Sequence, residues 1–256
     1  MINIHLVNKA EFAELLNSAS FLNDIGENVY IVKSYYSVQE IDKIKQTCLD
    51  FAKTIEPAWY PCVDDCPDYH RLHNNYPKAH VKSIQHAYYF HRWNGNHHLF
   101  NFFSDIFNIK ASMVNSNKTA LEYLNNIPST GPIARVLVHQ YPRGGGGQKE
   151  HIDPVSPYAK IQTIIQASIP NKDYHCGGLY INTNDTGKVY LDGITNKGDL
   201  IVMSPGIKHG VEAIDPEFEL DWSRDDGRWI IMPIIIDSDL KKDGYGKPIS
   251  IKQGEN

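Results

Sequence analysis

The pattern of hydrophobic and polar residues changes character near residue 130. Before that point two segments have helical spacing. Residues 9–17 form one, and the other follows Ser37, with apolar positions from Ile41 to Ile55 at spacings of 3, 4, 3 and 4. Ser37 and Glu40 form the S-x-x-E of a capping box at the start of the second segment. The pattern predicts a short first helix and a longer amphipathic one.

The rest of the first half predicts two strands, a further helix and a long loop. Residues 28–37 and 83–93 are rich in β-branched and aromatic side chains, which is typical of strands. Residues 97–108 have apolar positions at helical spacing. Residues 56–82 are rich in Pro, Asp, Asn, His and Tyr without a period, and we interpret them as a loop that covers the substrate.

After residue 130, short β-type runs alternate with turn signals. Runs at this spacing predict an all-β sandwich or barrel. They are residues 133–141, 160–170, 177–183, 187–193, 198–205, 209–215 and 228–237. We therefore expect a mainly β fold with flanking helices.

Length and composition favour one domain over all 256 residues, 41% of which are hydrophobic. We expect an N-terminal part over 1–129, a β core over 130–237 and a polar tail over 238–256. The net charge of −5 argues against a nucleic-acid-binding protein. The chain has no long apolar run and no signal sequence, so we expect no membrane association and a cytoplasmic protein. Four cysteines are too few for a disulfide framework, and we expect them to be reduced.

Candidate metal ligands stand in the run HIDP. His151 and Asp153 are one residue apart, so on a strand both side chains would point to the same face. His209 opens a later run, 209 − 151 = 58 residues downstream. Two histidines and one carboxylate are the ligand set of non-haem Fe(II) oxygenases. The alternative is that His151 and Asp153 form an ordinary hydrogen-bonded pair.

The four glycines at 144–147 do not form a phosphate-binding loop. Such a loop needs Ser or Thr directly after Gly-Lys, and here Gln148 separates the glycines from Lys149, which Glu150 follows. We interpret the glycines as a flexible hairpin turn that leads into the metal motif.

An arginine opens the last β-type run. Arg228 could hold a carboxylate through two parallel hydrogen bonds, a geometry that suits a planar guanidinium. Arg224, four residues earlier, competes for this role. It stands among acidic residues in a predicted turn, where a solvated ion pair explains it, so we prefer Arg228.

Taken together, the second half resembles the Fe(II)- and 2-oxoglutarate-dependent oxygenases, whose core is a double-stranded β-helix (a jelly-roll, cupin-like fold). The resemblance covers about residues 130–237, and the strand and helix within 28–55 also resemble the family's entry to its core. The matching pieces are a strand that ends in Tyr-Pro and a glycine turn, followed by HIDP, CGGLYI, GDLIVM, HGVEAID and GRW.

The resemblance implies that His151, Asp153 and His209 bind Fe(II). It also implies that Arg228 binds the distal carboxylate of the co-substrate 2-oxoglutarate, with Tyr141 as a further hydroxyl donor. The implied reaction uses O2 and hydroxylates an aliphatic C–H. Members of the family that halogenate have a small residue in the place of Asp153, so hydroxylation is favoured, while desaturation and ring closure remain open.

We expect a small-molecule substrate, such as an amino acid, a sugar acid or a natural-product intermediate. Arg143, Lys149 and Lys160 bracket the metal motif and could attract an anionic group, or could form a solvated rim. The alternative function is a cupin-like metal-dependent isomerase, or a protein that binds a small molecule or sugar without redox chemistry. Repair or demethylation of nucleic acid or protein is disfavoured by the acidic balance. The oligomeric state stays open.

The remaining histidines carry weaker hypotheses. Cys62, Cys66, His70 and His73 could form a zinc site, but only four positions separate the cysteine pair from the histidine pair, which is too close for the usual spacing. We expect packing or surface roles for a further group, namely His86, His91, His97 and His98.

Overall fold

A computed structural model of the chain describes residues 2–57, 66–76, 79, 81–114, 120–154, 156–183, 185 and 187–236. The predicted tail, 238–256, lies outside these described residues, as does Cys62 of the zinc hypothesis.

The first half contributes helices and four strands. In chain order they are β1 (Asn3–Val7), α1 (Lys9–Leu16), α2 (Phe21–Asp24), β2 (Asn28–Val32), α3 (Val38–Ala52), β3 (Tyr69–Asn74), β4 (Ser83–His91), a 3-10 turn (Arg92–Asn94), α4 (His97–Phe102), α5 (Ser104–Ser112) and α6 (Ala120–Asn125). The two helices predicted before residue 60 are confirmed as α1 and α3. The capping box of α3 is present, with both reciprocal bonds between Ser37 and Glu40. The single helix predicted over 97–108 is two helices, because the backbone leaves helical geometry at Phe103 (φ −93°, ψ 18°).

Part of the predicted loop is a strand. β3 pairs antiparallel with β4 along its whole length, from Tyr69 opposite Tyr89 to Asn74 opposite Ile84. Its sequence, YHRLHN, is mostly polar, yet most of these side chains are buried. The interpretation of 56–82 as entirely loop was therefore wrong at this segment, because buried polar residues give no apolar–polar alternation.

The second half supplies the remaining eight strands. They are β5 (Ile133–Tyr141), β6 (Gly146–His151), β7 (Gln162–Gln166), β8 (Gly178–Thr183), β9 (Gly187–Tyr190), β10 (Leu200–Met203), β11 (His209–Ile214) and β12 (Arg228–Ile236). Each of the seven predicted β-type runs contains a strand. The eighth, β6, begins within the glycine run.

The pairing order of the strands is β1-β2-β10-β7-β12-β5-β4-β6-β11-β8-β9, with β3 on β4. Apart from the β8–β9 hairpin, strands from β5 onward alternate between two groups, so that β5, β7, β10 and β12 are neighbours, as are β6, β8, β9 and β11. Chain segments that alternate between two facing groups make a jelly roll. The predicted fold class, mainly β with flanking helices, is confirmed.

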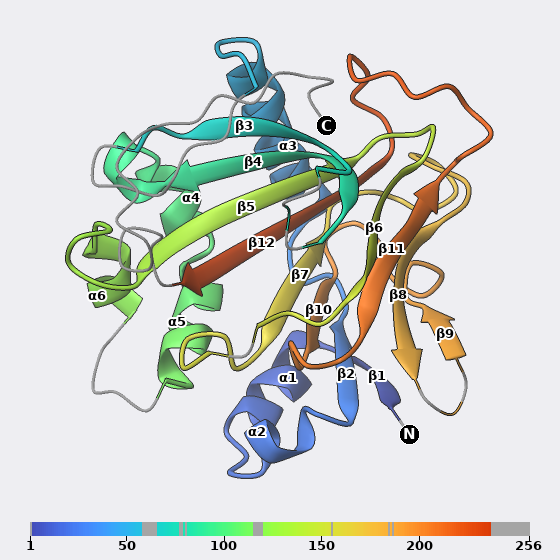
Figure 1. Cartoon of the computed structure of the whole chain (residues 1–256). Helices are drawn as coiled ribbons and strands as arrows, with labels where there is room; N and C mark the ends of the chain where they lie inside the picture. The colour runs from blue at the N-terminus through green and yellow to red at the C-terminus, as the bar shows by residue number, and fades with distance from the viewer. Residues whose placement is uncertain are drawn as a thin grey trace.

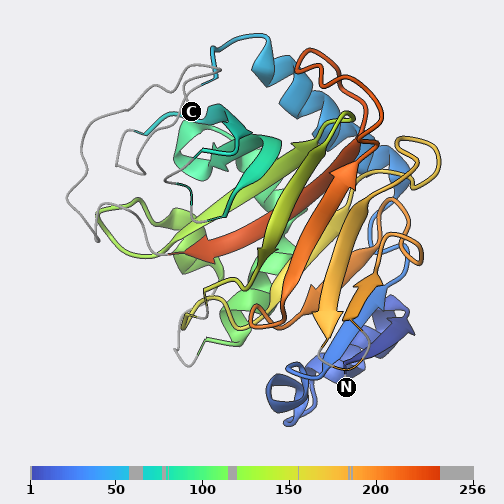
Figure 2. The ribbon, with the colours of Figure 1, turned by 45° about the vertical axis from the view of Figure 1, so that its right-hand side comes forward.

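Helices cover the outer face of the first group (Figures 1 and 2). The longest described helix, α3 (15 residues), buries Ile41, Ile44 and Cys48. They share one apolar cluster with Trp229 and Ile231 of β12. None of the helices within the described ranges is long and apolar enough to cross a membrane.

The opposite face of β12 belongs to a second cluster. Ile230 and Met232, which alternate with Trp229 and Ile231, pack with apolar residues of β7, β8, β10 and β11. The interior between the two strand groups is therefore separate from the helix-covered core, and the candidate site lies in it.

Candidate active site

A cavity of about 360 Å³ lies between the two strand groups. Its lining comes from β5, β6, β7, β8, β11 and β12, from the connection between β6 and β7, and from Lys110 of α5. Isoleucines of β12 form much of one wall, and the polar groups include His151, Asp153 and His209. A cavity of this size and lining suits a small ligand.

The structure brings the three predicted metal ligands together. One ligand atom from each of His151, Asp153 and His209 lies within 4.8 Å of the others. Each histidine Nε2 is 3.5 Å from one oxygen of the Asp153 carboxylate. The convergence arises because His151 ends β6 and His209 begins β11, and these two residues are direct partners in the antiparallel pairing.

The geometry of the HxD motif differs from the predicted one. We expected a strand to point both side chains to one face, but β6 ends at His151 and Asp153 lies beyond it. Asp153 is held by its own contacts instead. Its backbone N–H donates to Pro205 O (2.9 Å), and Gln162 Nε2 donates to its Oδ2 (2.7 Å).

Both histidines are oriented by backbone carbonyl groups. Nδ1 of His151 lies 2.8 Å from Lys149 O, and Nδ1 of His209 lies 2.8 Å from Ile207 O. A carbonyl oxygen can only accept, so each Nδ1 carries the proton. The neutral imidazole then offers its Nε2 lone pair to the cavity. Burial lowers the pKa of His209, against the opposing effect of Asp153, and so favours this neutral form.

The three residues therefore fit a divalent metal such as Fe(II). Two nitrogen lone pairs and one carboxylate converge on the same space, and the second ring nitrogen of each histidine is already used in a bond that fixes the ring. Such supporting bonds are usual for metal-binding histidines.

Arg228 lines the same cavity and is fully buried. Its Nε and Nη2 donate to the two oxygens of Asp192 (2.6 and 2.9 Å), and Nη2 also donates to Gln166 Oε1 (3.1 Å). Burial opposes the charged form, but Asp192 raises the pKa of Arg228 above its usual value. Nη1 is buried and makes no hydrogen bond among the described residues. The guanidinium thus keeps two N–H donors for a ligand.

Tyr141 stands beside Arg228 in the cavity. The two residues are direct partners between β5 and β12, and the guanidinium carbon lies 5.8 Å from the centre of the tyrosine ring. The Tyr141 hydroxyl donates to Gln148 Oε1 (3.1 Å). Burial raises the pKa of Tyr141, so the hydroxyl stays protonated and can serve as a donor.

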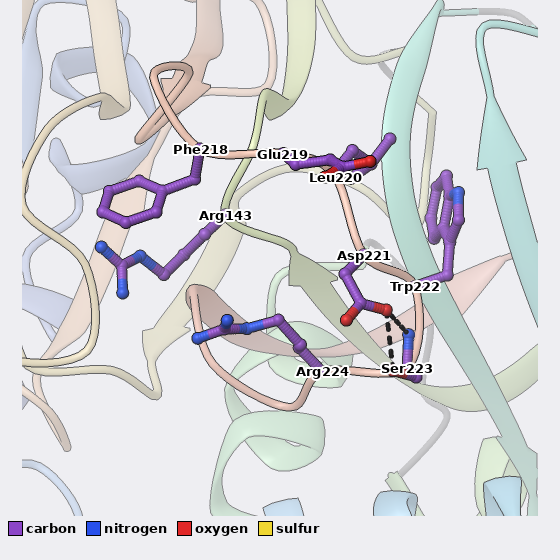
Figure 3. Close-up of a pocket in the computed structure, with 8 residues that line it drawn as sticks. All are labelled: Arg143, Phe218, Glu219, Leu220, Asp221, Trp222, Ser223 and Arg224. Atoms are coloured by element: carbon purple, nitrogen blue, oxygen red, sulfur yellow. Dashed lines mark hydrogen bonds between the residues drawn. The ribbon is translucent and has the colours of Figure 1, made fainter.

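Arg224, the competing arginine, lies in a different place. Together with Arg143 it lines a shallow groove of about 750 Å³ formed mainly by the β11–β12 connection, as Figure 3 shows. Its side chain is exposed and pairs with Asp226. Arg224 is not among the residues that line the cavity of the three metal-ligand candidates.

The predicted cationic rim also lies outside the cavity. Arg143 donates to Asp215 (2.6 Å) and covers the Phe218 ring, while Lys149 and Lys160 are exposed. The lysine that does line the cavity, Lys110, was not predicted.

Sequence reasoning also missed His139, Gln162 and Asp192. His139 was open to prediction, because it is two residues from Tyr141 on β5 and therefore shares its face. Both of its ring nitrogens are buried without a hydrogen bond among the described residues. Burial lowers the pKa of His139 to about 4, so it is a neutral side chain in the cavity.

The zinc hypothesis fails on its described members. His70 and His73 are three residues apart on β3 and therefore point to opposite faces. His70 Nε2 is 2.9 Å from His86 Nδ1 instead. The packing or surface roles expected for a further group of histidines agree with the structure, since none of these residues lines the cavity. They are His86, His91, His97 and His98.

The glycine turn packs closely against a neighbouring segment at Gly144, whereas its predicted flexibility stays a prediction. Gly144 has φ +91°, and a Cβ there would lie 2.6 Å from the backbone of Leu220. Its N–H also donates to Ile214 O (3.1 Å). The turn needs glycine both for its left-handed backbone and for the close approach of a neighbouring segment.

No protein-family model and no curated protein sequence matches this chain. Solved structures do match it. A prolyl-4-hydroxylase from Pseudomonas putida has a TM-score of 0.53 at 11% identity, covering 87% of this chain and 98% of its own. An oxidoreductase of the 2OG-Fe(II) oxygenase family from Burkholderia pseudomallei has a TM-score of 0.50 at 12% identity, covering 93% and 96%. The chain therefore has the jelly-roll fold of the Fe(II)- and 2-oxoglutarate-dependent oxygenases.

Proposed function

We propose that this protein is an Fe(II)- and 2-oxoglutarate-dependent dioxygenase that hydroxylates an aliphatic C–H of a small molecule. One observation carries the proposal. The three ligand candidates His151, Asp153 and His209 share a cavity with Arg228, a buried arginine that keeps two N–H donors for a ligand.

His151, Asp153 and His209 would hold the iron on one side and leave its other positions open. The bound iron supplies the chemistry by which O2 and 2-oxoglutarate oxidise a substrate. Gln162 holds the Asp153 carboxylate through Oδ2, and the backbone bonds at each Nδ1 keep both imidazoles in the ligating tautomer. These contacts position the ligands before any metal arrives.

Arg228 would bind the distal carboxylate of 2-oxoglutarate through Nη1. Asp192 and Gln166 occupy the other guanidinium edge and hold the side chain in one orientation. The hydroxyl of Tyr141 donates to Gln148 in this structure and would have to turn away from it to donate to the same carboxylate. Such charge-assisted bonds are strong in a buried site.

The apolar wall supports an oxidative reaction. Ile230, Met232 and Ile234 line the cavity along β12. An apolar wall of this kind excludes water from the site.

The alternative, a cupin-like isomerase or a binding protein without redox chemistry, would use the same metal ligands. It has no need for a buried cation with free donors in the cavity. Arg228 therefore favours the oxygenase, and the difference can be tested through the co-substrate.

The test is anaerobic reconstitution with Fe(II), followed by addition of 2-oxoglutarate. We expect a weak visible absorption band, and stabilisation against heat that depends on 2-oxoglutarate. His151→Ala should abolish the band, whereas the matched variant His175→Ala, at an exposed histidine, should retain it. Absence of both the band and the stabilisation in the unmodified protein would refute the proposal.

A further variant tests the co-substrate site. Arg228→Lys keeps a positive charge but cannot keep both bonds to Asp192 while also offering the two N–H donors that Nη1 leaves for a ligand. We expect the concentration of 2-oxoglutarate needed for half of the band to rise at least tenfold, with iron binding unchanged. An unchanged requirement would remove Arg228 from the co-substrate site.

A further inference from the structure

The second cation of the cavity, Lys110, has no place in the function proposed above. It lies in α5, it is 3% exposed, and it lines the cavity with the three metal-ligand candidates. Among the described residues its Nζ makes one hydrogen bond, to the backbone oxygen of Ile161 (3.0 Å). An ammonium has three donors, so two hydrogens remain for a ligand.

Lys110 forms no ion pair with any described carboxylate, in contrast to Arg228. The negative charge of Asp153 favours the charged form of Lys110. Burial outweighs that effect and lowers the pKa of Lys110 to about 7. A buried ammonium without an anion is costly, and proteins rarely keep one without use.

The two cations lie toward opposite ends of β7. Lys110 binds Ile161, the residue before the strand, whereas Arg228 binds Gln166, the last residue of the strand. Five residues of a strand span about 16 Å, so the two side chains are anchored at opposite ends of β7.

The metal-ligand candidates are near the Lys110 end. Gln162, directly after Ile161, donates to Asp153, so adjacent residues contact the lysine and the carboxylate ligand. On the proposed function, 2-oxoglutarate would extend from the metal toward Arg228. The space on the Lys110 side of the metal is then left for the substrate.

We propose that the Lys110 ammonium forms a carboxylate-binding subsite, which holds an acidic group of the substrate at the metal end of the cavity. This inference rests on the proposed function and adds the substrate class, a small carboxylic acid. A monoanion fits better than a phosphate dianion, because a single ammonium supplies one charge and the neighbouring wall is apolar. Ile234, Ile235 and Ile236 provide that wall.

The experiment observes the lysine itself. Protein labelled with ¹³C at lysine Cε is loaded with Zn(II), which keeps the site redox-inactive, and saturated with 2-oxoglutarate. Lys110→Arg assigns the Lys110 resonance by its disappearance. Acetate is then added as the probe, with neutral acetamide of the same shape as its control.

We expect acetate to shift the Lys110 resonance saturably, with a dissociation constant on the order of 1–10 mM, as one charge-assisted contact allows. Acetamide should leave it unchanged. Lys149, exposed and outside the cavity, should show no saturable shift. No response to acetate, or an equal response to acetamide, would overturn the subsite.

Co-substrate controls separate this inference from the proposed function. If 2-oxoglutarate alone produces the shift and acetate adds nothing, Lys110 belongs to the co-substrate site and the inference is wrong. If 2-oxoglutarate gives no heat stabilisation of the Zn(II) protein while acetate still shifts Lys110, the anion subsite stands and the oxygenase proposal fails.

Discussion

The cavity holds two buried cations whose surroundings differ. Arg228 is surrounded by partners, with both oxygens of Asp192 and the amide of Gln166 on one edge of its guanidinium. Lys110 has one carbonyl oxygen and no described counter-ion. Arg228 therefore stays charged and in one orientation whether or not the cavity holds a ligand. Lys110 gains its counter-ion only when a ligand brings one.

This difference indicates how a cavity can be prepared for two acids at once. A cation that is already paired can share its remaining donors with a co-substrate at little cost in protein stability. An unpaired cation distinguishes between ligands, because only an anion relieves its burial. The comparison predicts that replacing Arg228 by an apolar residue strongly lowers the free energy of unfolding, whereas the same replacement of Lys110 changes it little.

The largest effect is expected at the arginine. Arg228→Met leaves the buried Asp192 without its counter-charge, and we expect the free energy of unfolding to fall by about 3–5 kcal/mol, measured by urea denaturation of the metal-free protein. Arg224→Met is the matched control, because that arginine is exposed, and its midpoint should not change. A loss below about 1 kcal/mol at Arg228 would show that the ion pair is not a structural element.

The glycine turn, which packs near the arginine end, should give the next largest effect. Gly144→Ala combines a left-handed backbone with a clash against Leu220, so we expect a loss of about 3 kcal/mol in the free energy of unfolding. Gly145→Ala should strain only the backbone, since its φ is +109° and nothing lies within 4 Å of a Cβ. We expect this variant to lose about 1–2 kcal/mol in the free energy of unfolding. If urea denaturation gave equal losses for the two variants, the close packing of Gly144 against Leu220 would be contradicted.

His139, two residues from Tyr141 on β5, should make the protein sensitive to acid. Its folded pKa of about 4 lies below the ordinary value of 6.5, so the unfolded state binds more protons between these values. The contribution of His139 to the free energy of unfolding is fully present above pH 6.5. It is lost as the pH falls toward 4, by about 1.4 kcal/mol per pH unit. His139→Gln should reduce the pH slope of the free energy of unfolding in this range by that contribution, and His175→Gln should not.

The smallest effect is expected at the lysine. In Lys110→Met, the lost bond to Ile161 is offset by removal of a desolvated charge, so we expect the free energy of unfolding to change by no more than about 1 kcal/mol. Thermal and urea denaturation both measure it. A loss above about 3 kcal/mol would mean that Lys110 is structural, and would erase the contrast with Arg228.

Much of the fold could be read from local patterns. The strands after residue 130 alternate or run apolar for a few residues between turns, and the capping box of α3 is a four-residue signal. The β3 strand could not be read in this way, because its buried side chains are polar. Their burial depends on the neighbouring β4, which lies later in the chain.

The candidate site was predictable in part for the same reason. The motif HIDP, His209 and Arg228 stand out by residue type and by their place relative to strands. The structure brings His151, Asp153 and His209 together, although Asp153 lies beyond the strand and is held by Gln162. Nothing near Lys110 in the sequence marks it as a cavity residue.

By itself, the sequence determined most of the strands after residue 130 and the residue types that could bind a metal, because spacing along a strand or helix decides which side chains share a face. Only the tertiary structure decided which cations line the cavity and which of them is paired. Those outcomes depend on contacts between distant positions, 36 residues apart for Arg228 with Asp192 and 51 for Lys110 with Ile161. Charge burial and pairing are properties of the assembled interior, and no local pattern encodes them.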